Sequence, residues 1–150
     1  MEFRMEADLP CAPDRLWPIM LDIREMAGCI PGIESIEEKE RLKAYSALMK
    51  QKIGPFKLEV PAEIVVEDFR ELEFVIAQAT GKDKFTGTTL RVNFDLRLEA
   101  IEAELTRLAV QADLQIAGRL ASLGHSMIKK KAQENFAEFE ANFRKRLEEV

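Results

Sequence analysis

The chain has 150 residues, with 22 Lys and Arg against 27 Asp and Glu, so its net charge at pH 7 is −5. Hydrophobic residues make up 47% of it, beside 7 glycines and 6 prolines. This composition is typical of a globular domain and excludes the disordered, collagen-like and low-complexity classes. The length predicts one domain, residues 1–150, that folds without a metal ion or a disulfide. The acidic balance argues against a nucleic-acid partner.

Signals for membrane insertion, secretion and metal binding are missing from the sequence. No stretch approaches the roughly 20 apolar residues of a membrane-spanning helix. The N-terminus carries acids where a signal peptide would be basic and then apolar. We therefore expect a cytoplasmic protein without a transmembrane anchor. Cys11 and Cys29 lack CxxC spacing and His125 is the only histidine, so we expect neither a disulfide nor a zinc site.

The first third of the chain predicts a strand, a short helical region and a turn. Residues 2–9 alternate polar and apolar side chains, which indicates a half-buried strand that ends at Pro10. A helix is expected from Pro13 and Asp14, because proline and an acid both suit the first helical turn. Residues 29–32, Cys-Ile-Pro-Gly, predict a turn, since proline forces the residue before it into extended geometry.

Six strand-like segments follow in series. Most alternate apolar and polar residues, and they are residues 33–41, 45–53, 56–66, 72–79, 90–98 and 108–116. Their connections are short, among them the Gly54-Pro55 turn and the loop of residues 81–87. Consecutive strands with short connections predict an antiparallel meander.

From Leu120 the apolar spacing changes from 2 to about 3.6, which predicts one helix of about 30 residues, or about 45 Å. Gly124 would lie inside this helix at a cost of about 1 kcal/mol, which either space for a ligand or tight packing against the early helices would justify. Only this helix is long enough to cover the apolar face of the sheet. We therefore expect an α+β fold, in which a curved antiparallel sheet of about seven strands surrounds the C-terminal helix.

A curved sheet around a helix leaves an apolar gap unless large side chains fill it, and such a gap suits a lipophilic ligand. Phe136, Phe139 and Phe143 are interpreted as core, and Asp113 as a structural residue on the outer face. The candidate residues of the ligand cavity are Trp17, Met20, Ile30, Pro31, Met49, Phe56, Phe94, Leu120, Leu123, Gly124, Met127 and Ile128.

Five short motifs carry a family resemblance. They are residues 29–32, residues 52–56 (Lys-Ile-Gly-Pro-Phe), the loop of residues 81–87, Ala112-Asp113, and residues 116–124 (Ile-Ala-Gly-Arg-Leu-Ala-Ser-Leu-Gly). In this order and spacing the chain resembles the CoxG family of carbon monoxide dehydrogenase subunits. That family lies within the Bet v 1-like, START-like (SRPBCC) superfamily of helix-grip folds.

The resemblance implies a non-catalytic accessory protein of a carbon monoxide dehydrogenase-type molybdenum hydroxylase. It also implies an apolar ligand, lipid- or quinone-like, and no tightly bound cofactor. Members of the family typically continue past the last helix into a hydrophobic tail, whereas this sequence ends at Val150, so any membrane contact is expected to be indirect or transient. The alternative is a helix-grip enzyme of the cyclase or hydrolase type acting on a hydrophobic substrate. A filled core without a ligand is the third possibility.

Basic residues gather in the last helix. Residues 119–150 hold 7 basic and 5 acidic side chains, whereas residues 1–118 hold 15 and 22. Lys129, Lys130 and Lys131 are candidates for a surface that docks an acidic partner or the inner face of the membrane, although the sequence favours a solvated helix face.

Overall fold

The computed structural model describes residues 1–149, in which seven strands and three α-helices form one α+β layer pair. The elements in chain order are β1 (Glu2–Leu9), α1 (Pro13–Leu21), α2 (Ile23–Cys29), β2 (Ile33–Glu40), β3 (Ala44–Ile53), β4 (Phe56–Arg70), β5 (Phe74–Lys82), β6 (Thr89–Glu102), β7 (Leu105–Ala117), the 3₁₀ helix η1 (Arg119–Leu123) and α3 (His125–Glu148). This confirms the predicted order of strand, short helices, six strands and long helix.

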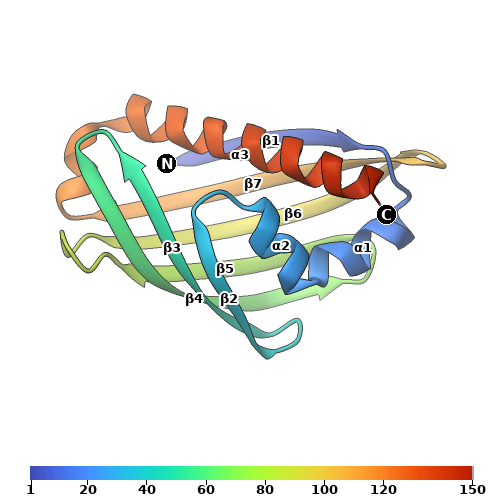
Figure 1. The fold of residues 1–150 in the computed structure, drawn as a ribbon, viewed down its shortest axis with the longest axis horizontal. Coiled ribbons are helices and arrows are strands. Elements are labelled where there is room, and N and C mark those ends of the chain that lie inside the picture. Colours follow the sequence, from blue (N-terminus) through green and yellow to red (C-terminus); the bar gives the residue numbers. More distant parts are fainter. Residues whose placement is uncertain (150) are drawn as a thin grey trace.

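The seven strands form one antiparallel sheet in the order β1-β7-β6-β5-β4-β3-β2. Only β1 leaves its place in the meander, because it pairs with β7 at the opposite edge from β2. Figure 1 shows the sheet curving around α3, which runs beside β1, with α1 and α2 toward the end where α3 finishes. The helix thus covers the concave face of the sheet, as the sequence predicts.

The long C-terminal helix begins later than predicted. The segment from Arg119 to Leu123 is a 3₁₀ turn, and α3 starts only at His125. Gly124 separates the two with a φ of 85°, a left-handed conformation that residues with a Cβ rarely adopt. The prediction that Gly124 lies inside a helix is therefore wrong, because the apolar spacing of 3.6 continues through a turn and a break in the backbone.

Three strands are clearly longer than predicted: β7 begins at Leu105, before the predicted start, and β4 and β6 end later. β4 continues past Val66 to Arg70 and β6 continues past Leu98 to Glu102. The extensions of β4 and β6 are rich in charged residues and exposed throughout, so their side chains lose the alternation that predicts a strand.

Candidate functional site: the inner face of the sheet

The strand register places one row of apolar side chains across the sheet. Phe3 lies opposite Ala112, Ala112 opposite Phe94, and Phe94 opposite Ala77. Residues directly opposite one another share a face. Ile128 of α3 packs against Phe3 and Ala112, so this row faces the helix. We call the helix-facing side of the sheet the inner face.

Buried clusters close the inner face at both ends. At one end Trp17 of α1, only 5% exposed, packs against Val75 and Ala77 of β5. At the other end Leu120 of η1 packs against Leu58 and Val60 of β4. Trp17 and Leu120 both come from helical segments outside the sheet, and each places a large apolar side chain on its inner face.

The last turns of α3 are also packed against the sheet. Phe143 and Leu147 are buried against Leu9 of β1 and Leu108 of β7. The aromatic rings continue up the helix, with Phe139 and Phe143 stacked at 5.4 Å between ring centroids. Phe143 is core as predicted.

Between these clusters the inner face is less completely covered. On β6 all five helix-facing side chains from Leu90 to Leu98 are half-buried, whereas those of β7 from Thr106 to Ala112 are buried. On the helix, Phe136 and Phe139 are half-buried as well. Apolar surface therefore stays accessible between the middle of α3 and the centre of the sheet.

The structure divides the twelve predicted cavity residues among several clusters. Leu120 is joined by Met49, Phe56 and Leu123, and Ile128 is joined by Phe94. Trp17 plugs the opposite end, and Met20 packs on the cluster around Phe143. The remaining four are Ile30, Pro31, Gly124 and Met127. That these residues contact a ligand stays a prediction.

Some of the twelve point away from the inner face. Ile30 is 36% exposed and Met127 is 45% exposed, which places both partly on the surface. Met127 instead lies beside the turn between β3 and β4, where its sulfur is 3.1 Å from the position of a Cβ on Gly54. Helical periodicity placed Met127 on the apolar stripe, but the break at Gly124 sets the direction of the first turn of α3.

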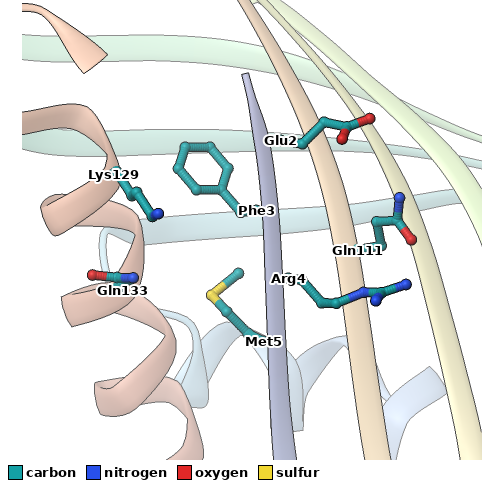
Figure 2. A pocket seen from close by; sticks show the side chains of 7 residues that line it. All are labelled: Glu2, Phe3, Arg4, Met5, Gln111, Lys129 and Gln133. Atoms are coloured by element: carbon teal, nitrogen blue, oxygen red, sulfur yellow. The ribbon is translucent and has the colours of Figure 1, made fainter. Parts of the chain in front are cut away.

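A first hollow of about 530 Å³ lies between the edge strand β1 and the first half of α3. Figure 2 shows Phe3 and Met5 on the helix side of β1, with Lys129 and Gln133 projecting from α3, and Arg4 on the other side of the strand. Its lining is largely polar. This hollow is therefore not the apolar cavity that the sequence predicts between the helix and the sheet.

A second hollow of about 370 Å³ lies where η1 meets α3, and Gly124, His125 and Ile128 contribute to it. His125 is exposed at the first position of α3. None of the residues that line this hollow is acidic, so His125 has no orienting carboxylate there.

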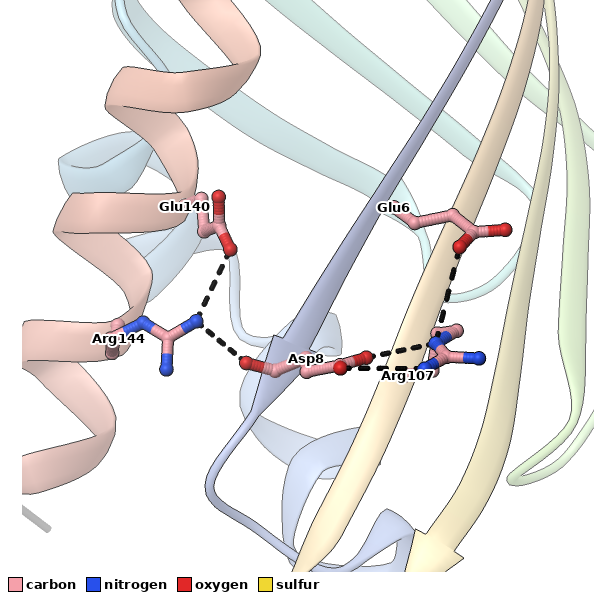
Figure 3. Close-up of polar contacts among 5 residues, drawn as sticks. All are labelled: Glu6, Asp8, Arg107, Glu140 and Arg144. Carbon is pink, nitrogen blue, oxygen red and sulfur yellow. Dashed lines mark hydrogen bonds and ion pairs between the residues drawn. The ribbon is translucent and has the colours of Figure 1, made fainter.

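A polar clamp fastens the end of α3 to the edge of the sheet. Arg144 donates a hydrogen bond to the carbonyl oxygen of Asp8 (2.6 Å) and another to Glu140 (3.1 Å). On the other side of β1, Arg107 pairs with Asp8 and Glu6, as Figure 3 shows. The hydrogen bond from Arg107 lowers the pKa of the Asp8 carboxyl, against a smaller opposing effect of burial.

The loop of residues 81–87 contains the buried acid that sequence reasoning missed. Asp83 is only 1% exposed and accepts hydrogen bonds from the backbone of Glu59, Phe85 and Thr86 and from the Thr86 hydroxyl. Burial raises the pKa of Asp83, but these donors outweigh it and leave the pKa below its ordinary value. The Asp-x-x-Thr spacing is a signal for such a turn, and it was available in the sequence.

The same loop is joined to the start of the C-terminal segment. The Thr86 hydroxyl bonds to that of Thr88, and the backbone N–H of Leu120 donates to the Thr88 hydroxyl (3.3 Å). Gly118 allows this approach, because a Cβ there would lie 2.9 Å from the Thr88 Cα. Two of the five motifs are therefore parts of one structural network.

Residues 1–149 contain no cluster of three or more His, Cys, Asp or Glu side chains placed to hold a metal ion. Within the same residues, no helix combines the length and the apolar character needed to cross a membrane. Cys11 and Cys29 are both buried as free thiols.

The chain matches one known protein family over most of its length. The family model for CoxG, a carbon monoxide dehydrogenase subunit, matches residues 6–148. The chain belongs to the CoxG family. No curated protein matches this chain. The family name describes a subunit, which supports an accessory or binding role for this CoxG-family domain.

Solved structures share the fold at low sequence identity. A conserved protein from Geobacillus kaustophilus superposes with a TM-score of 0.90 at 19% identity, covering 99% of this chain and 96% of that one. A START superfamily protein from Mycobacterium smegmatis gives 0.68 at 14% identity, covering 99% and 97%. The Zhui aromatase/cyclase from a Streptomyces species gives 0.73 at 13% identity, covering 99% and 93%. The START-like helix-grip fold is thereby confirmed.

Proposed function

We propose that this protein is a non-catalytic CoxG-type subunit that holds an apolar small molecule, lipid- or quinone-like, between the sheet and α3. In this proposal it assists a carbon monoxide dehydrogenase-type molybdenum hydroxylase in the cytoplasm, at the inner face of the membrane. The family match supports the partner. The accessible apolar surface on the inner face is the observation that supports the proposal of an apolar ligand.

That surface has the chemistry a lipophilic molecule requires. At its centre, Ala79 lies opposite Ile64 on one side and Val92 on the other, and all three side chains are half-buried. Removing apolar surface from water contributes about 25 cal/mol per Å². A ligand that covers this surface would complete the core that the protein leaves open.

The inner face has few polar groups for catalysis. Tyr45 and Gln51, the polar residues that strand parity places inward, are already engaged. The Tyr45 hydroxyl accepts a hydrogen bond from the Leu42 backbone, and the Gln51 amide donates to the Pro31 carbonyl. The aromatase/cyclase of the same fold nevertheless keeps an enzyme acting on a hydrophobic substrate as the second candidate function.

The only tryptophan of the chain provides a direct test, because Trp17 lies against the inner face. A short-chain ubiquinone analogue titrated into the protein is expected to quench its fluorescence with saturation. Ala79→Phe fills the centre of the inner face and is expected to weaken quenching at least about tenfold, equivalent to about 1.4 kcal/mol.

Thr80→Phe is the matched control, since Thr80 lies on the outer face of the same strand, opposite Glu63 and Arg91. It is expected to leave quenching unchanged. Circular dichroism checks that both variants fold. Quenching that is linear and unsaturated in the wild type, or equal in both variants, would contradict the proposed ligand site.

A further inference from the structure

One end of the molecule concentrates positive charge. The antiparallel order brings together the β3–β4 turn, the β5–β6 loop and the β7–η1–α3 junction, all at the same end in Figure 1. Residues 51–57, 81–91 and 115–131 together contain nine Lys and Arg and a single acid, Asp83. Because Asp83 is buried, the surface of this end is almost purely basic. We call these three segments the basic end.

The opposite end is acidic. The β4–β5 and β6–β7 turns lie there, and residues 63–73 hold five acids and one arginine, while residues 99–104 hold three acids and no basic residue. A chain of net charge −5 thus carries about +8 at one end. Such a field orients the molecule toward an anionic surface before contact.

Large apolar side chains project from the basic end. Phe85 at the tip of the β5–β6 loop is 70% exposed, the most exposed large hydrophobic residue of the described chain. It follows Lys82 and Lys84, both exposed. Met127, 45% exposed, projects beside the β3–β4 turn at the same end.

The loop that presents Phe85 is held in place. Asp83 accepts a hydrogen bond from the Phe85 backbone (3.2 Å), and the Lys84 backbone donates to the Glu59 carbonyl of β4 (3.1 Å). The ring is thereby kept in water by a fixed backbone, so insertion into a partner would cost little loop ordering.

We infer that the basic end docks on an anionic lipid bilayer, with Phe85 inserted between headgroups and the surrounding lysines on the lipid phosphates. A bilayer is favoured over a protein partner because the apolar groups are separate projections on different turns. Neither of the two hollows described above is lined by Phe85 or Met127. A basic surface and an apolar anchor are the two signals that together give stable binding to a membrane.

This inference names the surface for the membrane contact in the proposed function and depends on that part of it alone. Binding is measured by cosedimentation with vesicles of phosphatidylcholine with and without phosphatidylglycerol, in the absence of quinone. A failure therefore leaves the ligand test by Trp17 quenching unaffected. The wild type is expected to bind only the anionic vesicles, and more weakly as salt is raised.

Two variants test the surface and two matched variants control for it. Lys82→Glu with Lys84→Glu is expected to weaken vesicle binding by at least about tenfold, since each lysine near an anionic surface contributes about 1 kcal/mol. Phe85→Ser is expected to weaken it by about tenfold. The controls lie away from the basic end and make the same substitutions: Lys39→Glu with Lys43→Glu at the β2–β3 turn, and Phe69→Ser in β4, where Phe69 is 43% exposed. They are expected to bind within about twofold of the wild type.

Insertion of residue 85 into the bilayer is measured separately from the electrostatic attraction of the basic end. In a Phe85→Trp variant, lipids brominated on the acyl chain are expected to quench the fluorescence of the new tryptophan. The fluorescence of the buried Trp17 is expected to persist. Absence of binding to anionic vesicles, or equal losses in the test and control variants, would overturn the inference. Loss of a carbon monoxide dehydrogenase-type complex in the Lys82 and Lys84 variant, without any vesicle binding by the wild type, would assign the basic end to a protein partner instead.

Discussion

At the scale of single residues, Asp83 stands at the centre of a hydrogen-bond network that joins three segments of the chain. Its carboxylate joins the β5–β6 loop to β4 through the Glu59 backbone, and Thr86 and Thr88 extend the network to Leu120 of η1. A buried carboxylate is stable only when donors replace its water. The loop that carries one of the family motifs is therefore built around this acid.

Asp83→Asn is expected to lower the free energy of unfolding at pH 7 by about 1.5–3 kcal/mol, because it replaces hydrogen bonds to a charge. The lowered pKa of Asp83 sets the sign of the pH dependence. The stabilisation is fully present above the ordinary carboxyl pKa and is lost as the pH falls below about 4 through the lower pKa of the folded state. Urea unfolding from pH 7 to pH 3 should show a shallower loss for Asp83→Asn than for the wild type.

Asp68→Asn is the control for this measurement. Among residues 1–149, the Asp68 carboxylate accepts a hydrogen bond only from the next backbone N–H, of Phe69, and the residue is exposed. It is expected to change stability by less than about 0.5 kcal/mol. Identical pH profiles for the wild type and Asp83→Asn would contradict the role assigned to the Asp83 carboxylate.

At the scale of elements, the break before α3 determines which side chains of that helix face the sheet. Gly124 adopts a φ of 85°, and a Cβ there would meet no atom within 4 Å. Tight packing does not explain the glycine, and its left-handed backbone is a sufficient reason for it. The same feature turns Met127 outward and Ile128 inward.

Gly124→Ala is therefore expected to lower the free energy of unfolding by about 1–2 kcal/mol through backbone strain. A glycine inside a helix would give the opposite sign, and Gly28 of α2 provides that comparison. Gly28 also has open space around its Cβ position but no positive φ. Gly28→Ala is expected to raise the free energy of unfolding by about 0.4–1 kcal/mol. Urea unfolding of both variants distinguishes the left-handed backbone at Gly124 from the helical backbone at Gly28. An increase in stability for Gly124→Ala would contradict the break between η1 and α3.

At the scale of the whole molecule, α3 is attached at its ends and spans a less filled middle. The clamp of Arg144 on the Asp8 carbonyl and the pairing of Arg146 with Glu25 hold the last turns, and η1 holds the start. Charge is distributed unevenly along the molecule, because the basic end lies opposite the acidic β4–β5 and β6–β7 turns.

Arg144→Met is expected to destabilise the fold by about 1–2 kcal/mol, because the Asp8 carbonyl loses its charged donor while the apolar stem is kept. Amide hydrogen exchange should also rise in the last turns of α3. Lys145→Met, at an exposed neighbouring position, is expected to change neither quantity. Equal exchange in the two variants would show that the clamp does not hold the helix.

Much of the fold could be predicted because it follows from local patterns. Alternation predicted β1 within its observed bounds and the centres of the other strands, and a period of 3.6 predicted the body of α3. The site could be predicted less well. Trp17, Leu120 and Ile128 were predicted on the inner face and are buried there, whereas Ile30 and Met127 are partly exposed. Periodicity specifies a helix face only relative to the helix itself, and the rotation of α3 depends on Gly124.

The sequence by itself determined the antiparallel meander, the closing helix and the family, since these depend on residue spacing and on motifs in a fixed order. Only the tertiary structure showed that Asp83 is buried, that Gly124 interrupts the last helix, and that three distant basic segments share one end. These features depend on which turns meet in space, and a net charge of −5 carries no information about that arrangement.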